Sequence, residues 1–200
     1  MDVNSWDEDT VFRAQLDPEI FNTDFVSIFP LQGVARALAI AKPGLSIRLT
    51  QDGYATQISF PNGPSDRLLE MNWGNGFPYR PIRLRTGDTQ NHLDMAFRVA
   101  KHDHNWFETY VNGEWIEGGS HLEKFAALLK QHTQLAGNAV FSFWLTEPNF
   151  EGPCKDLLKS KLANDLVKTA LEDKLPIAIT KRPDLVDIFR NTDFVSNDND

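Results

Sequence analysis

The 200-residue sequence has a single cysteine and no apolar run long enough to cross a membrane. One thiol, Cys154, excludes an internal disulfide, and no spacing of cysteine and histidine is typical of a zinc site. The longest apolar-leaning runs, 37–41 and 139–145, are far shorter than the roughly 20 residues of a spanning helix. We therefore expect no membrane span, and we interpret Cys154 as an inert thiol.

Basic residues are scarce as well. The chain has 20 Lys and Arg against 28 Asp and Glu, a formal net charge of −8. Because nonspecific DNA affinity requires cations that neutralise phosphates, we expect contact with DNA to be indirect. The N-terminus, 1–9, is acidic and lacks the apolar core of a secretory signal and the arginines of a transit peptide, which favours a cytoplasmic protein.

Composition divides the chain into four parts. Hydrophobic residues make up 41% and charged residues 24%, proportions that can build an ordinary globular core. Glycine and proline concentrate at 73–81, where neither a helix nor a strand can continue. We predict an N-terminal segment at 1–72, a joint at 73–91, a domain at 92–190 and a disordered tail at 191–200.

Periodicity in the N-terminal segment predicts a helix over 31–41, which Pro43 and Gly44 end. Its packed face is predicted to consist of Leu31, Val34, Ala35 and Leu38. The Asp-Gly pair at 52–53 lies between two strand-like runs and predicts a hairpin of 45–50 with 54–60. One or two helical turns are expected at 65–72.

Alternation of apolar and polar residues predicts a strand at 93–99, which we expect to pair as a hairpin with 106–111. A further strand is predicted at 139–145. A helix is expected to run through Leu158, Leu162, Leu166 and Leu171, and a short helix to follow at 183–190. Strands in series with crossing helices indicate an α+β sandwich, with one sheet covered on one side.

The first candidate site lies where another helical pattern begins, at Glu117, Gly118, Gly119, Ser120 and His121. Ser120 and Glu123 have the spacing of a capping box, which predicts that Ser120 caps the helix. We favour a structural interpretation in which the two glycines form a tight turn. The alternative is an anion site at the helix N-terminus, assisted by His121.

Two other segments invite a functional interpretation. His102 and His104 lack a third ligand at a fixed spacing, so we interpret 102–104 as a turn rather than a metal site. A basic and aromatic segment is either a nucleic-acid or partner surface or, as we favour, a long loop packed down by its aromatic residues. Its members are Trp73, Phe77, Tyr79, Arg80, Arg83 and Arg85.

Two motifs resemble a known family. Residues 117–125 are similar to E-G-G-T-H-x-x-G-F, and residues 147–155 to E-P-x-F-E-G-Q-T-K, of the transducer domain in the B subunit of bacterial DNA gyrase and topoisomerase IV. With weaker similarity upstream, the resemblance covers roughly Thr10 to Leu171 and is patchy between Ser65 and Thr89. The resemblance implies a ribosomal-protein-S5 domain 2-like sandwich with a mixed four-stranded sheet backed by helices, preceded by a remnant of the ATPase lobe.

The resemblance also implies a chemical role. In the family a loop carries a Gln and a Lys to the terminal phosphate of ATP, and Lys155 occupies the lysine position. Pro153 and Cys154 replace the Gln and Thr, and proline brings no amide hydrogen to the loop. Alone the chain is expected to bind no cofactor, to hydrolyse no ATP and to cut no DNA. ATP and Mg²⁺ are expected only in the context of a complete nucleotide lobe.

These expectations define one leading hypothesis and two alternatives. The leading hypothesis is a transducer-like module of a type II DNA topoisomerase that couples nucleotide state to movement of a DNA gate. The first alternative is an enzyme completed in trans by a nucleotide lobe. The second is a stand-alone, divergent homologue that binds or regulates a topoisomerase subunit. The expected protein partner is a topoisomerase subunit or a second copy of the chain.

Overall fold

The computed structural model describes residues 29–51, 53–71, 80–100, 105–133, 135–152 and 156–189. The helices are α1 (Phe29–Ala41), α2 (Pro64–Glu70), α3 (Ser120–His132), α4 (Lys161–Thr169), the π-helical turn η2 (Ala170–Lys174), α5 (Leu175–Thr180) and α6 (Pro183–Phe189). The strands are β1 (Ser46–Gln51), β2 (Tyr54–Ser59), β3 (Ile82–Gly87), β4 (His92–Ala100), β5 (Trp106–Val111), β6 (Glu114–Ile116), β7 (Gly118–Gly119), β8 (Ala136–Trp144), β9 (Phe150–Glu151) and β10 (Leu157–Leu158). Among the helices of these ranges, none has the length and apolar character to span a bilayer.

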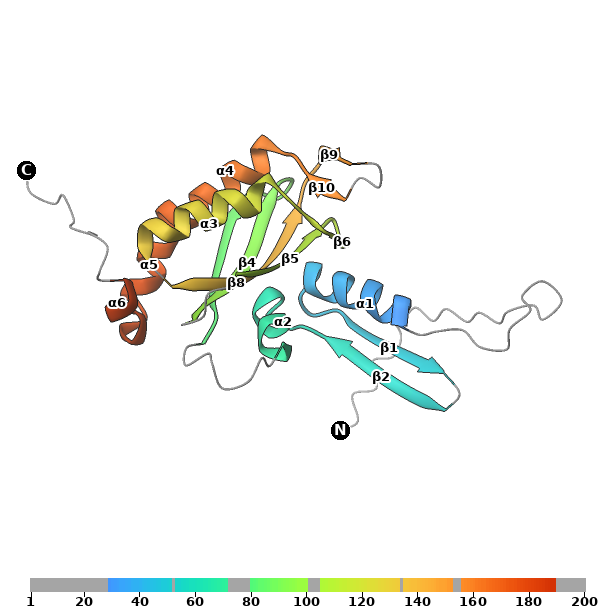
Figure 1. Cartoon of the computed structure of the whole chain (residues 1–200). Helices are drawn as coiled ribbons and strands as arrows, with labels where there is room; N and C mark the ends of the chain where they lie inside the picture. The colour runs from blue at the N-terminus through green and yellow to red at the C-terminus, as the bar shows by residue number, and fades with distance from the viewer. Residues whose placement is uncertain are drawn as a thin grey trace, which may run out of the picture.

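The main sheet has the strand order β3-β4-β8-β5-β6 (Figure 1). It is mixed, because β8 runs antiparallel to β4 and parallel to β5. The expected hairpin between 93–99 and 106–111 is wrong, since β8 lies between these two strands. Residues 139–141 of β8 are completely buried, and a strand buried on both faces is stabilised by pairing along both edges. The sheet has five strands in place of the expected four.

Both faces of the sheet are covered, whereas the sequence predicted a cover on one face only. On the first face, under α3 and α4, the aromatic rings of Phe97, Phe107 and Phe141 pack edge-on around Phe125 with centroids 5.1–5.6 Å apart. On the second face, α1 and α2 form a smaller core (Figure 1). This core contains Ala35, Ala37, Ala39, Ile40, Ile58, Phe60, Leu68, Ala96, Tyr110 and Val140.

The predicted helix over 31–41 is confirmed as α1, but its packed face is largely wrong. Leu31, Val34 and Leu38 are 53%, 57% and 38% exposed. Of the predicted face only Ala35 is buried, together with other small residues of α1. Alanines let a helix approach neighbouring strands closely, and that close packing turns the larger leucine and valine side chains outward.

The hairpin of β1 with β2, the helical turns of α2 and the strand β8 are found as predicted. The helix expected to start near Leu158 begins at Lys161 instead. Ser160 caps it by accepting a hydrogen bond from the Ala163 backbone N–H at 3.2 Å. Leu166 and Leu171 are buried as expected, but Leu158 lies in β10 and Leu162 is exposed.

An ion-pair network joins the N-terminal helices to the sheet. The guanidinium of Arg67 on α2 donates from Nε and Nη2 to the carboxylate of Glu108 on β5, at 2.8 and 3.0 Å. Its Nη1 donates to Glu70, which also pairs with Arg36 on α1 at 3.6 Å. Burial opposes the charge, but the Glu108 carboxylate holds the pKa of Arg67 above its usual value. The bidentate contact therefore fixes α2 on the second face of the sheet.

Replacing Arg67 by alanine should lower the free energy of unfolding by about 2 kcal/mol, because Glu108 would be left largely buried without its cation. Urea denaturation measures the change. The control is Arg85→Ala: this side chain is 60% exposed, so its loss should cost less than about 0.5 kcal/mol. Equal losses for the two variants would show that the network does not anchor α2.

Candidate functional site at the junction of the two motifs

The two sequence motifs, although more than twenty residues apart, meet in a small three-stranded sheet. β7 pairs in parallel with β10, which pairs antiparallel with β9. The carbonyl of Asp156 accepts hydrogen bonds from the backbone N–H of Glu117 and Gly118, at 3.1 and 3.4 Å. We call β7, β9, β10 and the first turn of α3 the motif junction. Strand β10, which follows the second motif, thus joins the two motifs, because it pairs with β7 of the first and with β9 of the second.

Gly119 is required by the close approach of β10. Its φ is +150°, and a Cβ at this position would lie 2.1 Å from the carbonyl oxygen of Leu158. No side chain fits in that space, so only glycine allows β7 and β10 to pair here. The glycine pair therefore serves strand pairing, beyond the tight turn predicted from the sequence.

Ser120 does not cap α3 in the way that the capping-box spacing predicted. The helix begins at Ser120 itself, and the cap position is Gly119, which has no side chain to offer. The Ser120 hydroxyl donates instead to Oδ1 of Asn164 on α4, at 3.1 Å. The prediction fails because Gly119 pairs with β10, and the helix therefore starts one residue later than a Ser120 cap requires. Ser120 consequently links the first turns of α3 and α4.

His121 points into the first core of the protein. Its Nε2 lies 2.9 Å from the Thr109 hydroxyl, and its ring packs edge-on against Phe141 and Phe143. The residue is completely buried, and burial lowers the pKa of its imidazole to about 3. A neutral, enclosed imidazole favours the structural interpretation of the motif over an anion site that uses His121.

The segment that carries Lys155 is anchored at both ends. Residues 153–155, which include Pro153, Cys154 and Lys155, lie outside the described residues. On one side, Glu151 pairs with Leu157 in the sheet, and its carboxylate accepts from Nζ of Lys159 at 2.5 Å. On the other, the Asp156 carbonyl is held by β7. The loop ends are therefore fixed beside the first turn of α3.

The described ranges contain no group of three or more His, Cys, Asp or Glu residues placed to hold a metal ion. His102 and His104 fall outside those ranges.

The basic segment is only partly visible, since Trp73, Phe77 and Tyr79 lie outside the described residues. Its arginines at 83 and 85 belong to β3, a strand that the sequence analysis missed within the expected joint. Arg83 donates from Nε and Nη2 to Asp94 on β4, at 2.8 and 2.5 Å, and Arg85 Nε donates to the same carboxylate at 2.9 Å.

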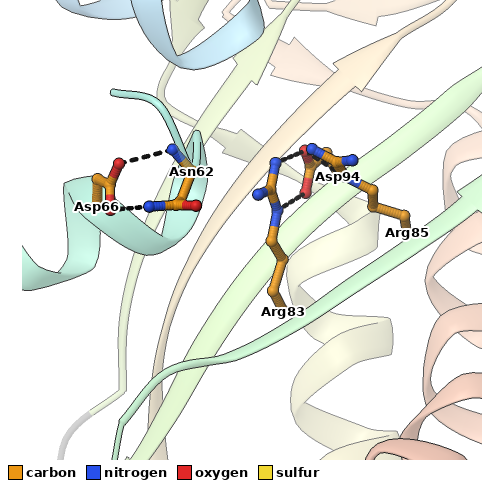
Figure 2. Close-up of polar contacts among 5 residues, drawn as sticks. All are labelled: Asn62, Asp66, Arg83, Arg85 and Asp94. Atoms are coloured by element: carbon orange, nitrogen blue, oxygen red, sulfur yellow. Dashed lines mark hydrogen bonds and ion pairs between the residues drawn. The ribbon is translucent and has the colours of Figure 1, made fainter. Parts of the chain in front are cut away.

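Figure 2 shows both guanidinium groups converging on Asp94, near the turn in which Asn62 donates to Asp66. Because Arg83 and Arg85 share the Asp94 carboxylate, this segment presents less unpaired positive charge than its sequence suggested. The pairing disfavours the interpretation of this segment as a nucleic-acid surface.

A Gly119→Ala variant should lose about 3 kcal/mol or more of unfolding free energy, because β7 and β10 must separate to admit the methyl group. Chemical denaturation monitored by circular dichroism gives the value. Gly33→Ala is the matched control. No atom lies within 4 Å of its Cβ position in α1, so it should be neutral or stabilising by up to about 1 kcal/mol. A tolerated Gly119→Ala would contradict the described register.

His121 should make the protein less stable in acid. Its pKa is lower in the folded chain than in the unfolded chain, so the unfolded chain takes up the proton first as the pH falls below about 6.5. The His121 contribution is lost at about 1.4 kcal/mol per pH unit until the folded-state value near 3 is reached. In urea titrations between pH 7 and pH 4, His121→Leu should show a correspondingly shallower pH slope; parallel slopes would exclude this role.

The chain is similar in sequence to B subunits of bacterial type II topoisomerases. No family model matches the chain. It is 24% identical over 196 residues to the type 2 topoisomerase B subunit of Aquifex aeolicus, covering 85% of this chain and 25% of that protein. It is 22% identical over 209 residues to the DNA gyrase B subunit of Thermotoga maritima, covering 88% of this chain and 33% of that protein. The chain therefore spans a quarter to a third of the length of these curated relatives.

Solved structures share the fold. The 43K ATPase domain of Thermus thermophilus gyrase B superposes with a TM-score of 0.72 and 20% identity, covering 88% of this chain and 54% of that domain. The topoisomerase IV ATP-binding domain of Francisella tularensis gives 0.64 and 21%, with the same coverage. The α+β class with a mixed sheet and helices is thereby confirmed. Sequence and fold together show that this chain is homologous to part of the B subunit of DNA gyrase and topoisomerase IV.

Proposed function

We propose that the chain is a transducer-like module of a type II DNA topoisomerase, which couples nucleotide state to movement of a DNA gate in the cytoplasm and is inactive alone. The observation that carries the proposal is the motif junction. Strands β9 and β10, which flank residues 153–155 in the sequence, pair with each other, and β10 also pairs with β7 directly before α3. Ser120 of α3 in turn bonds to Asn164 of α4. A contact between the Lys155 segment and a nucleotide could therefore shift α3 and α4, the helices that cover the first face of the sheet.

The proposed switch depends on charge. A lysine ammonium is a compact point charge that binds the terminal phosphate of ATP, and it loses this partner when the phosphate leaves. Pro153 and Cys154 remove donors that the family loop supplies, so Lys155 carries the contact by itself in this proposal. ATP and Mg²⁺ would be held by a nucleotide lobe outside this sequence.

The domain assignment belongs to the same proposal. We assign 82–190 to a ribosomal-protein-S5 domain 2-like unit and 1–72 to the end of a nucleotide lobe, with 73–81 joining them. The unit begins earlier than the predicted 92 because β3 pairs with β4 in the main sheet. Support comes from the relatives and from the grouping of α3 and α4 over the sheet. The packing of α1 and α2 on the opposite face, locked by Arg67 and Glu108, would let the end of the lobe and the sheet move together.

Lys155→Ala should weaken the binding of a non-hydrolysable ATP analogue roughly tenfold, because one charge-assisted contact is lost. Isothermal calorimetry at low salt would compare the variants in a mixture of this chain with the unmatched half of the Thermus thermophilus gyrase B ATPase domain. Lys168→Ala is the matched control, since Lys168 is a 51% exposed lysine at the end of α4 and pairs with Glu172 at 3.7 Å. Equal affinities for the parent and Lys155→Ala would exclude the switch.

A second candidate function rests on a separate observation. Leu31, Val34 and Leu38 form an exposed apolar stripe on α1, and Trp115 on the edge strand β6 is 57% exposed. Apolar surface of this kind is typical of a protein–protein contact. It favours the stand-alone homologue that binds or regulates a topoisomerase subunit. The calorimetric mixture described above distinguishes the two functions. A regulator would bind the added half of the gyrase B ATPase domain, but the affinity for the ATP analogue would not depend on Lys155.

A further inference from the structure

A cavity of about 380 Å³ lies beside the C-terminal end of α1, on the second face of the main sheet. Strands β4 and β8 line it with His92, Asp94 and Ser142, of which the last two are cross-strand partners. Ala41 and Pro43 line it from the end of α1, and the turn between β3 and β4 lines the remaining side. We call it the β3–β4 cavity. Its volume is in the range of small-molecule sites, and none of its lining residues belongs to the motif junction.

The turn that lines this cavity is held in place by hydrogen bonds. The carboxylate of Asp88 accepts from the backbone N–H groups of Gln90 and Asn91, at 2.8 and 2.7 Å. The side-chain oxygen of Asn91 accepts in turn from the backbone N–H of Thr146, two residues beyond β8, at 2.9 Å. A site whose wall is already fixed loses less conformational entropy when a ligand binds.

Three side chains of the cavity have hydrogen-bonding groups that the protein does not use. Nδ1 of His92 is buried, and no described residue bonds to it. Ser142 is only 6% exposed, and its hydroxyl bonds to none of the residues that the structure describes. Arg85 donates from Nε to Asp94 at 2.9 Å, which leaves Nη1 and Nη2 available. A buried polar group without a partner costs free energy, and a ligand that bonds to it would recover that cost.

The carboxylates of the cavity are already occupied. Asp94 accepts from both Arg83 and Arg85, and Asp88 accepts from the backbone of its own turn. A cationic ligand would therefore find no unpaired carboxylate among these residues. The end of the Arg85 guanidinium, in contrast, offers two parallel N–H groups with the spacing of the two oxygens of a carboxylate.

A second cation lies close to the cavity. Lys42, the residue between Ala41 and Pro43, packs its ammonium over the ring of Trp144, with 5.9 Å from Nζ to the ring centroid. Trp144 is the cross-strand partner of His92, so the ammonium lies beside the cavity. Two cations at one cavity, in a chain with a net charge of −8, favour an anionic ligand.

We propose that the β3–β4 cavity binds a small hydroxycarboxylate. The carboxylate contacts Nη1 and Nη2 of Arg85, and the hydroxyl contacts the Ser142 hydroxyl and Nδ1 of His92. A hydroxyl suits this pair because it can donate to one group and accept from the other. Each polar group of the ligand thus meets a group that the protein leaves without a partner, and Ala41 and Pro43 cover the carbon chain.

Calorimetry of the full chain tests the proposal with malate and succinate, two dicarboxylates that differ by one hydroxyl. The parent should bind malate saturably and roughly fivefold more tightly than succinate, because only malate reaches Ser142 and His92 with a hydroxyl. Ser142→Ala should remove most of this preference and leave the affinity for succinate unchanged. Arg85→Ala should weaken the binding of both compounds roughly tenfold, because the charge-assisted contact to the carboxylate is lost.

The matched control is Arg182→Ala. Arg182 also donates from two nitrogens to one aspartate, Asp184, but it lies directly before α6 and does not line the cavity. This variant should bind malate like the parent, and circular dichroism should report the same fold for all variants.

Three results would overturn the proposal. They are the absence of saturable malate binding up to about 50 mM, equal affinities of the parent for malate and succinate, and tighter binding of inorganic phosphate than of either dicarboxylate. The inference goes beyond the proposed nucleotide switch and can fail independently of it, because Lys155→Ala should leave malate binding unchanged.

Discussion

The insertion of β8 between β4 and β5 is the constraint on which the rest of the structure depends. This strand pairs along both edges, and its two faces contribute to two different cores. Phe141 and Phe143 face α3 and the C-terminal helices, while Val140 faces α1 and α2. Strand β5, which β8 holds in place, supplies Glu108 to Arg67 on one face and Thr109 to His121 on the other. Loss of β8 would therefore release the N-terminal helices and the motif junction together.

The sequence predicted the local elements well and their spatial partners poorly. Helical periodicity located α1, the Asp-Gly pair located the β1–β2 turn, and apolar runs located β8. Strand order was missed because alternation identifies a strand but not its neighbour. The face of α1 was missed for a related reason: hydrophobicity favoured Leu31 and Leu38, whereas the alanines permit the close packing that the structure shows. β3 was hidden because its alternating arginines resemble a basic loop until Asp94 is seen to pair with them.

The candidate site shows the same division. Motif similarity selected the two segments that the structure brings together, although no periodicity could have predicted that Gly118 and Gly119 form a strand with Leu157 and Leu158. The distance of a Cβ at Gly119 from Leu158 depends on tertiary packing, which has no local sequence signal. Ser120 and His121 are polar residues in a motif, and such residues invite a chemical role. Their actual partners, Asn164 and Thr109, explain both as parts of the framework.

The central position of β8 also determines the order in which this protein can mature on the ribosome. Strands β4 and β5 are synthesised first, yet in the described sheet they share no pairing with each other and must wait for a strand that emerges after α3. Non-local pairing of this kind slows folding, because a long loop must close before any contact is gained. Until β8 arrives, the nascent chain carries two apolar strands with unsatisfied edges, a species prone to aggregation. The arrangement that makes the finished sheet stable thus makes its biogenesis dependent on timely release of the C-terminal half.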